Sequence, residues 1–339
     1  MKNNCDKDSQ LSKQIVQWYL KNGRNNLPWR KNVTAYRVWI SEIMLQQTQV
    51  KTVIPFFKKF LRRYPNLKSL SKANEEEILA LWTGLGFYRR AINIYKAKEI
   101  ILSDFKNRFP KSFDDIVRLP GIGESTAGAI MSIAYQVPYP ILDANVKRVI
   151  SRYESVDNDS THKSNKKLWA LSNKHTPKKN IFSYTQGIMD LGATICHNSK
   201  PNCDICPLQH DCKSAFKVKA IKKETKKQNP TKKINYVLAR SNNSFLLFKK
   251  IEESFWEGLW TPLELNPNHP LPWKYDIQTL EEISMKHKLS HLNLEIKINI
   301  YSYERVFKLK TNEKYKWINK SNIDKYGMPK PIKSIIEKL

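Results

Sequence analysis

The sequence lacks any apolar run long enough to cross a membrane. A spanning helix needs about 20 consecutive, mostly apolar residues, and no stretch of the 339 residues reaches that length. The first ten residues, MKNNCDKDSQ, also lack the apolar core of a secretion signal. These two absences exclude a membrane-spanning protein, and we expect an intracellular chain with no membrane partner.

Acidic residues are also scarce. The chain has 31 Asp and Glu against 59 Lys and Arg, which gives a formal net charge of +28. A surplus of this size favours a polyanionic partner such as nucleic acid. The chain is rich in Lys, Asn and Ile together, a bias that a low-GC genome produces without any function. The positions of the charges therefore carry more weight than their number.

Cysteine is rare, yet four of the five cysteines lie close together. Cys196, Cys203, Cys206 and Cys212 form a C-x6-C-x2-C-x5-C cluster within seventeen residues. Because thiols stay reduced inside a cell, this spacing indicates a metal centre rather than disulfides. Zinc is the weaker alternative, since the usual paired C-x2-C knuckles are missing. Cys5 stands apart, and no role is assigned to it.

Two glycines mark the stretch around which the first part of the chain is organised. Residues 119–143 read LPGIGESTAGAIMSIAYQVPYPILD. Gly121 and Gly123 separate a short helical pattern from a longer one, which predicts a helix, a hairpin and a second helix. Glycines in such a turn bring backbone N–H groups close to an anion, and the second helix points its positive end the same way. The natural anion is a DNA phosphate, although Gly-rich turns also occur in ordinary helical hairpins.

The first two thirds of the chain follows helical periodicity throughout. The apolar spacing predicts helices at residues 11–20, 35–49, 50–64, 74–82, 87–102, 113–118, 124–135, 144–154, 165–174 and 181–191. We therefore expect this part to be all-α.

Two carboxylates in the helical part are candidates for catalysis. Glu42 is embedded in the apolar set of the 35–49 helix, and Gln46 lies one turn later on the same side. A lone helical Glu usually faces solvent, but partial burial would raise its pKa from about 4.3 toward neutrality and make it a general acid. Asp143 lies in the loop after the second helix of the hairpin.

Two aromatic residues are followed directly by two basic residues at positions 87–90, which read FYRR. This mixture suits stacking on bases and holding phosphates. Phe87 and Tyr88 fit a core position equally well, so both readings stay open at this point.

The composition changes after Cys212. Residues 213–233 are dense in Lys and read as a solvated linker with non-specific phosphate affinity. Beyond them, apolar alternation predicts strands at 236–239, 245–248, 294–301 and 314–318, with helices at 277–286 and 332–338. We expect a helical domain at 1–212, a basic linker at 213–233 and a smaller α+β domain at 234–339.

Residues 1–212 resemble the endonuclease III superfamily of DNA glycosylases, and within it the MutY family. The matching stretches are LPWR (27–30), WISEIMLQQTQV (39–50), LWTGLGFYRRA (81–91), LPGIGESTAGAI (119–130) and PILDANVKRV (140–149). Residues 234–339 resemble the Nudix-like domain of the same family, with FWEGLWTP (255–262) as a matching stretch. The resemblance implies a helix-hairpin-helix glycosylase domain with one four-iron, four-sulfur cluster on the four clustered cysteines.

The resemblance also implies an activity. The chain is expected to be a monofunctional adenine DNA glycosylase of base excision repair, which hydrolyses the N-glycosidic bond of adenine mispaired with 8-oxoguanine or guanine in duplex DNA. Glu42 would protonate adenine, Asp143 would stabilise the sugar cation, and Asn145 would lie beside them. The remaining expected DNA contacts are Arg24, Trp29, Arg30, Gln46, Gln47, Phe87, Tyr88, Gly121, Gly123 and Ser125, with Gln47 and Phe87 as wedges in the duplex. We expect a monomer in the bacterial cytoplasm, associated with the nucleoid.

The second domain is expected to read the opposite base. Ser290 and His291, within KHKLSHLNL, are similar to the serine and histidine of the family's 8-oxoguanine-sensing loop. No run resembles the acidic Nudix helix that binds magnesium, which excludes pyrophosphatase activity.

The chain departs from the family pattern at four positions. Phe87 replaces the more usual Tyr, Leu289 replaces Phe, and Asn25 stands where a basic residue is common. Glu124 stands where Arg is often found. Its carboxylate suits a helix N-terminus but not a nearby phosphate, so we expect weaker anchoring at the hairpin.

Two other functions stay open on the sequence alone. A bifunctional glycosylase and lyase of the endonuclease III type needs an amine nucleophile on the second helix of the hairpin, where this chain has Ser125. A non-enzymatic iron–sulfur protein that binds DNA or senses redox state would have no use for carboxylates at Glu42 and Asp143.

Overall fold

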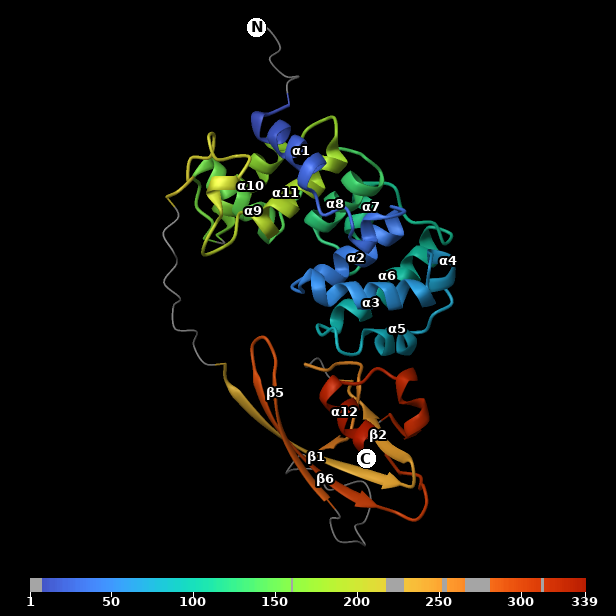
Figure 1. Cartoon of the computed structure of the whole chain (residues 1–339). Coiled ribbons are helices and arrows are strands. Elements are labelled where there is room, and N and C mark those ends of the chain that lie inside the picture. The colour runs from blue at the N-terminus through green and yellow to red at the C-terminus, as the bar shows by residue number, and fades with distance from the viewer. Residues whose placement is uncertain (1–7, 160, 218–228, 252–254, 266–280, 312–313) are drawn as a thin grey trace. The chain divides into compact units, whose positions relative to one another are not determined.

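The computed structural model describes residues 8–159, 161–217, 229–251, 255–265, 281–311 and 314–339 (Figure 1). Contacts within the chain group it into two compact units. The first comprises Met1–Ser71 and Lys96–Glu224, and the second comprises Lys72–Tyr95 and Thr225–Leu339. A short piece of the N-terminal helical sequence thus packs with the C-terminal part of the chain. The domain boundaries expected at residues 212 and 234 stay a prediction.

The described residues of the first unit form helices joined by turns, as the all-α prediction requires. In chain order these are α1 (Gln10–Asn22), α2 (Ala35–Leu45), α3 (Val50–Arg63), α4 (Leu67–Leu70), most of α6 (Arg89–Asp104), α7 (Phe113–Val117), α8 (Glu124–Ala134), α9 (Ala144–Glu154), α10 (His162–His175) and α11 (Ile181–Thr194), with 3-10 turns at Pro28–Arg30 and Cys203–Ile205.

Polar side chains fix where several of these helices begin. Ser9 caps α1, Thr34 caps α2 and Asp143 caps α9, each by accepting hydrogen bonds from backbone N–H groups in the first turn. A cap of this kind stabilises a helix by about 1 kcal/mol. The position of the Asp143 carboxylate is therefore set by the local sequence of α9.

Two glycines let the helices around Asp143 approach closely. A Cβ on Gly128 in α8 would lie 2.3 Å from the carbonyl oxygen of Pro140. A Cβ on Gly192 in α11 would lie 2.6 Å from the Cβ of Asn145 in α9. Any larger side chain would push these segments apart, so the two glycines hold the start of α9 against α8 and α11.

The helix predicted at residues 35–49 is shorter in the structure. The helix α2 ends at Leu45 rather than at Gln49, because Gln46 leaves the helical conformation and Gln47 has a φ of +55°. The apolar spacing continues through this turn, so periodicity alone placed the end four residues late.

Another predicted helix begins too early. The helix α6 starts at Arg89 rather than at Phe87, because Gly86 and Phe87 have φ values of +79° and +50°. These left-handed conformations place Phe87 in a loop, where its side chain is 41% exposed.

The second unit combines α5 (Glu75–Trp82) with a mixed sheet and a terminal helix. Its strands are β1 (Thr231–Ser241), β2 (Ser244–Lys249), β3 (Trp260–Thr261), β4 (Leu263–Glu264), β5 (Glu281–Lys288), β6 (Asn293–Ser302) and β7 (Tyr315–Asn319), followed by a 3-10 turn at Lys320–Lys325 and α12 (Lys330–Lys338). The sheet has the order β3-β2-β1-β6-β5, with β4 paired to β1 and β7 paired to β2. β1 and β6 are parallel, whereas β5 and β6 form an antiparallel hairpin.

The helix predicted at residues 277–286 is wrong for its described part. Glu281–Lys288 form β5, which is hydrogen-bonded along β6. Exposure alternates along β5 with a period of two, so Ile283, Met285 and His287 are half-buried between exposed neighbours. Residues 277–280 lie outside the described residues.

The predicted linker at residues 213–233 overlaps the first strand of the sheet. β1 begins at Thr231, so the last three residues of the 213–233 stretch belong to the sheet. Residues 218–228 of that stretch, like Cys5, lie outside the described residues.

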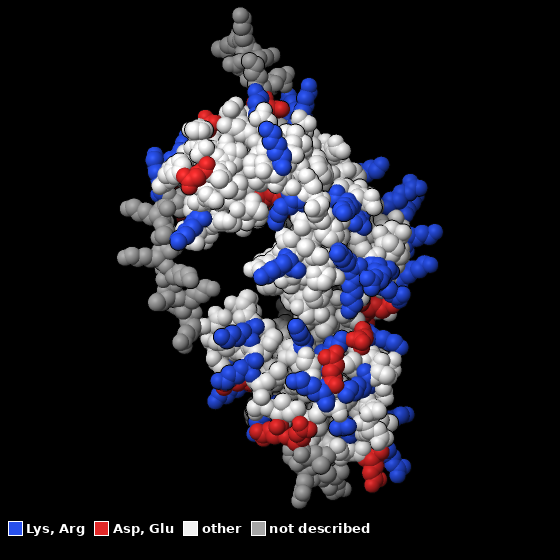
Figure 2. All heavy atoms as spheres, in the orientation of Figure 1, with Lys and Arg blue, Asp and Glu red and all other residues white. Residues whose placement is uncertain are grey.

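Lys and Arg side chains are spread over much of the face drawn in Figure 2, and Asp and Glu are fewer there. This distribution agrees with the net charge of +28. Within the described ranges, no helix has the length and the apolar content that crossing a membrane requires.

Candidate active site

A pocket of about 530 Å³ lies in the first unit among α2, α9, α11 and the segment that joins α1 to α2. Both candidate catalytic carboxylates, Glu42 and Asp143, line it. The other predicted site residues that line it are Arg24, Trp29, Arg30 and Asn145. Pockets for small ligands usually have volumes of about 300–1,000 Å³, so this pocket has room for a nucleobase.

Glu42 lies near the C-terminal end of α2, and its sequence neighbours Ser41 and Ile43 are buried. Burial raises the pKa of its carboxyl group to about 7, and the negative charge of Asp143 adds to the rise while Arg30 opposes it. A carboxyl group with a pKa near neutrality holds a proton that it can give to a bound base.

Asp143 has a different environment from Glu42. Its Oδ1 accepts hydrogen bonds of 2.8 Å from the backbone N–H groups of Asn145 and Val146 at the start of α9. Burial raises the pKa of Asp143, and these two donors and the Arg148 guanidinium oppose the rise. Donors aimed at a carboxylate favour its ionised form, so the start of α9 favours the Asp143 carboxylate.

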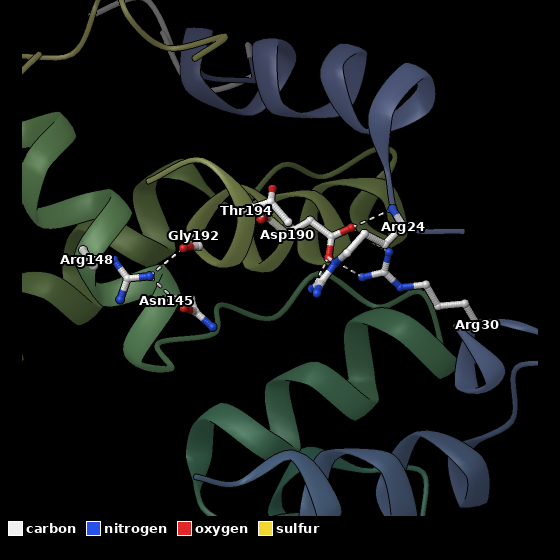
Figure 3. A network of polar contacts seen from close by, with 7 residues as sticks. All are labelled: Arg24, Arg30, Asn145, Arg148, Asp190, Gly192 and Thr194. Atoms are coloured by element: carbon white, nitrogen blue, oxygen red, sulfur yellow. Dashed lines mark hydrogen bonds and ion pairs between the residues drawn. The ribbon is translucent and has the colours of Figure 1, made fainter. Parts of the chain in front are cut away.

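Arg24 and Arg30, which line the pocket, share a buried ion pair with Asp190 (Figure 3). Asp190 of α11 has no exposed surface, and its carboxylate accepts hydrogen bonds from Nε of Arg24 and from both terminal nitrogens of Arg30, at 2.7 to 2.8 Å. Burial alone would raise the pKa of Asp190, but the two guanidinium groups hold it below its usual value.

This ion pair gives Arg30 an internal partner. The Arg30 side chain is only 4% exposed, whereas that of Arg24 is 30% exposed. The guanidinium of Arg24 is therefore more accessible to a ligand than that of Arg30. Trp29 is also buried, and it packs edge-on against Phe57.

Asn145 is held by Arg148, which also contacts the segment that carries Cys196. The guanidinium of Arg148 donates hydrogen bonds to Oδ1 of Asn145 at 2.8 Å and to the carbonyl oxygen of Gly192 at 2.6 Å (Figure 3). Its Nε donates to the carbonyl oxygen of Cys196 at 2.6 Å. One side chain thus connects the residue beside Asp143 with the first cysteine of the cluster.

The four clustered cysteines line a second cavity in the same unit. Burial raises the pKa of the Cys206 thiol to about 11, and the three neighbouring thiols add to the rise. A cation faces the cluster, since Arg152 donates from Nη1 to the Sγ of Cys196 at 3.3 Å. Among the residues that the structure describes, no three His, Cys, Asp or Glu side chains meet in the arrangement of a single bound metal ion.

The hairpin brings several predicted contacts together. Gln46 donates a hydrogen bond to the carbonyl oxygen of Gly121 at 3.2 Å, and Gly121 has a φ of +81°. Ser125 accepts from the backbone N–H of Leu142 at 3.0 Å, which turns its hydroxyl toward the segment before Asp143. Gln47 is exposed next to Gln46, and Gly123 precedes α8 as its cap.

The remaining predicted site residues lie in the second unit. Phe87 and Tyr88 occupy the turn between α5 and α6, where the Tyr88 hydroxyl is hydrogen-bonded to backbone groups. Ser290 and His291 are exposed at the turn between β5 and β6, with Ser290 Oγ 3.3 Å from Nδ1 of His291.

Sequence reasoning missed three residues of this site. Asp190 and Gln186 are buried on α11 and line or support the pocket wall, and Arg148 connects Asn145 to Cys196. A single acid within the apolar pattern MDLG was the available signal for Asp190. The partners of Asp190 lie 160 and 166 positions away, which no local pattern reports.

Comparison with known proteins agrees with this geometry. Residues 40–174 match the model of the HhH-GPD superfamily base excision DNA repair proteins, and residues 235–338 match the NUDIX domain. The structure of a thermostable thymine-DNA glycosylase is similar with a TM-score of 0.56 and 28% identity, over 61% of this chain and 95% of that one.

Two relatives extend the match to nearly the whole chain. The adenine DNA glycosylases of Buchnera aphidicola from Acyrthosiphon pisum and from Schizaphis graminum are 43% and 42% identical to it. Each alignment covers 96% of this chain, and 97% and 98% of the relatives.

The helical unit carries the match to a class of protein, the base excision DNA repair glycosylases of the helix-hairpin-helix type. Within that class, the chain belongs to the family of adenine DNA glycosylases. The Nudix-like character predicted for the C-terminal part is confirmed by the same comparison.

Proposed function

We propose that this chain removes adenine mispaired with 8-oxoguanine or guanine in duplex DNA, by hydrolysis of the bond between C1′ and N9. The observation that carries the proposal is the shared pocket of Glu42 and Asp143, in which the pKa of Glu42 is raised to about 7. Paired carboxylates in unlike environments are typical of reactions that pass through a sugar cation.

Adenine inside a duplex is out of reach, so it must first leave the stack. Extrusion of a base costs a few kcal/mol, which side chains inserted into the duplex would offset. Gln47 and Phe87 suit this role because both are exposed in turns with positive φ, at +55° and +50°. The extruded adenine would then enter the 530 Å³ pocket.

Glu42 supplies the proton that makes adenine a leaving group. Neutral adenine departs poorly, and protonation of a ring nitrogen, expected to be N7, lets it accept the electron pair of the C1′–N9 bond. As that bond stretches, positive charge grows on the sugar. Asp143, with two backbone N–H groups on its carboxylate, opposes that charge in the ionised form. Water then adds at C1′ and gives up a proton, which the Glu42 carboxylate left by the first step can accept, and an abasic site results.

Other pocket residues suit orientation of the base. Gln186 is 4% exposed and lines the pocket, so its amide offers both a donor and an acceptor for the edge of adenine. The ion pair with Asp190 holds Arg30 in place on the pocket lining. The hydrogen bond from Arg148 holds Asn145 in place beside Asp143.

We also propose that the cysteine loop binds one four-iron, four-sulfur cluster through Cys196, Cys203, Cys206 and Cys212. Four thiols on one cavity with a guanidinium nearby suit an anionic thiolate-bound cluster. Four Cys thiolates are the usual ligands of such a cluster, and these four side chains would supply them. When bound, the cluster would hold the loop of residues 196–212 in one fold.

The C-terminal part would read the base opposite adenine. 8-Oxoguanine carries an N7–H donor where guanine has an acceptor. The hydroxyl of Ser290 can accept from that donor, and His291 lies within reach to orient the hydroxyl. In this proposal residues 1–212 carry the chemistry and 234–339 select the mispair, joined by a basic linker, and the protein acts as a monomer.

Base release from three duplexes tests the proposed activity. Adenine opposite 8-oxoguanine and opposite guanine should be released, and adenine opposite thymine should remain. Because Ser125 replaces an amine on the hairpin helix, the product strand should break only after alkali or heat. Lys51 lines the pocket, so borohydride trapping of wild type that is lost in Lys51→Ala would instead indicate a lyase.

A further inference from the structure

The loop that carries Phe87 has an unusual backbone. Gly84, Gly86 and Phe87 have φ values of +97°, +79° and +50° within four residues. An aromatic side chain in the left-handed region costs about 1 kcal/mol or more, so neighbouring contacts must hold this conformation.

Contacts from the adjoining helices provide one anchor. Trp82 of α5 donates from Nε1 to the carbonyl oxygen of Gly86 at 3.1 Å, and Arg90 of α6 donates to the same oxygen at 3.0 Å. The Arg90 guanidinium also lies 5.2 Å from the centre of the Phe87 ring. Arg90 is 7% exposed, so this anchor is well buried.

Tyr88 provides a second anchor from a distant part of the sequence. Its hydroxyl accepts from the backbone N–H of Gly84 at 3.2 Å and donates to the carbonyl oxygen of Met328 at 3.2 Å. One oxygen thus joins the start of the loop to the turn before α12, and both belong to the second unit. The hydroxyl is engaged in this bridge, and the direct DNA contact predicted for Tyr88 stays a prediction.

The turn before α12 is itself fixed against α5. The backbone N–H of Gly327 donates to a carboxylate oxygen of Glu76 at 2.9 Å, and the N–H of Met328 donates to Oγ1 of Thr83 at 3.5 Å. A Cβ on Gly327 would lie 2.6 Å from the Cβ of Leu79, so the turn has no room for a larger residue there. Lys249 of β2 adds ion pairs to Glu75 and Glu76 of α5 at 3.4 Å.

We propose that Tyr88 is a positioning residue through which the Gly327–Met328 turn of the C-terminal part holds the Phe87 wedge in its left-handed conformation. The role given to Phe87 rests on the proposed function, whereas the anchoring of the loop does not. The C-terminal part, which selects the opposite base in the proposed function, would then also fix the conformation of the Phe87 wedge that supports extrusion of adenine.

Hydrogen exchange of the full-length protein without DNA tests the anchoring. In Tyr88→Phe, the amides of residues 83–88 should exchange about fivefold faster, the equivalent of about 1 kcal/mol for one lost hydrogen bond. The matched control is Tyr36→Phe, which removes a similar bond from a tyrosine hydroxyl to the carbonyl oxygen of Tyr64 in the first unit. The control should leave the exchange of residues 83–88 at the wild-type rate.

A second variant approaches the same contact from the other side. Gly327→Ala should displace the turn from Leu79 and speed exchange in residues 83–88, although no residue of that segment is substituted. Wild-type exchange in both Tyr88→Phe and Gly327→Ala would overturn the proposal. Faster exchange in the Tyr36→Phe control as well would overturn it too, because the loop would then report general loosening.

Fluorescence of 2-aminopurine placed beside an adenine·8-oxoguanine pair tests the effect on the wedge. Wild type and Tyr36→Phe should raise the fluorescence because they unstack the 2-aminopurine base. The rise with Tyr88→Phe should be about half of the wild-type rise or smaller. An equal rise in Tyr88→Phe would overturn the coupling to Phe87. If wild type gives no rise, the proposed wedge fails, and the exchange experiment still decides whether Met328 anchors the loop.

Discussion

The carboxylates of Glu42 and Asp143 line the same pocket, and the charge of Asp143 adds to burial in raising the pKa of Glu42 to about 7. The same pair therefore makes Glu42 a proton donor near neutral pH and places a counter-charge beside it. Asp143 owes its place to the start of α9, whereas Glu42 owes its pKa to the apolar surroundings of α2.

The raised pKa of Glu42 predicts how stability depends on pH. The folded state holds this proton up to about pH 7 and the unfolded state only to about pH 4.5, so the contribution of Glu42 to stability falls as pH rises through that window. Glu42→Gln removes this penalty and should stabilise the protein by on the order of 2 kcal/mol at pH 8, with little effect at pH 4. Urea unfolding at both pH values measures the difference, and equal effects at the two would contradict the assignment.

Asp190 should be essential to the fold of the pocket wall. Asp190→Ala leaves the Arg30 guanidinium, only 4% exposed, without its carboxylate. Removal of one partner from a buried ion pair costs about 3–5 kcal/mol. The ion pair of Lys333 with the exposed Asp324 is the control, since Asp324→Ala should cost less than about 1 kcal/mol. Denaturant unfolding measures both variants. An equal, small loss of unfolding free energy in Asp190→Ala and Asp324→Ala would refute the account.

Cys203→Ser tests the cluster. The variant should lose the visible absorbance of an iron–sulfur centre and its soluble yield should fall, because a ligand of the loop fold is missing. Cys5→Ser, outside the C-x6-C-x2-C-x5-C cluster, is the control and should keep both. Stoichiometric zinc in the purified wild type, without iron, would show that the metal assignment is wrong.

The exposed turn between β5 and β6 should set the preference for 8-oxoguanine. Ser290→Ala combined with His291→Ala should slow excision of adenine opposite 8-oxoguanine much more than opposite guanine, since a polar contact of this kind discriminates by about 1–3 kcal/mol. If the two residues only complete the turn, both substrates should slow together. The ratio of single-turnover rates on the two duplexes distinguishes these outcomes, and an unchanged ratio would exclude the sensing role.

The sequence predicts the elements whose signals are local. The helix at residues 144–154 agrees with α9 at both ends, because Asp143 is a cap and the apolar spacing is regular. The end of α2 and the start of α6 were missed because Gln47 and Phe87 adopt positive φ, which propensity does not report. The strand β5 was read as a helix, since its half-buried edge position gives it only a weak apolar alternation.

The residues of the site also differ in whether a local sequence signal predicts them. Glu42, Asp143, Asn145 and the four cysteines were predicted from short local motifs, at residues 39–50, 140–149 and 196–212. The bonds from Asp190 to Arg24 and Arg30, and the bond from Tyr88 to Met328, join segments 160 to 240 positions apart. Only the folded chain brings these partners together, so the supports of the site could not be read from the sequence.

The central claim is that Glu42 supplies the proton for adenine release, and the Glu42→Gln variant tests it most directly. The amide is nearly isosteric and keeps the pocket shape, so binding to an adenine·8-oxoguanine duplex should stay close to wild type, as it should in Glu337→Gln, an exposed control on α12. Single-turnover release of adenine should fall by about two orders of magnitude or more in Glu42→Gln alone, because no proton is available to the leaving base. Near-normal release by Glu42→Gln would contradict the account.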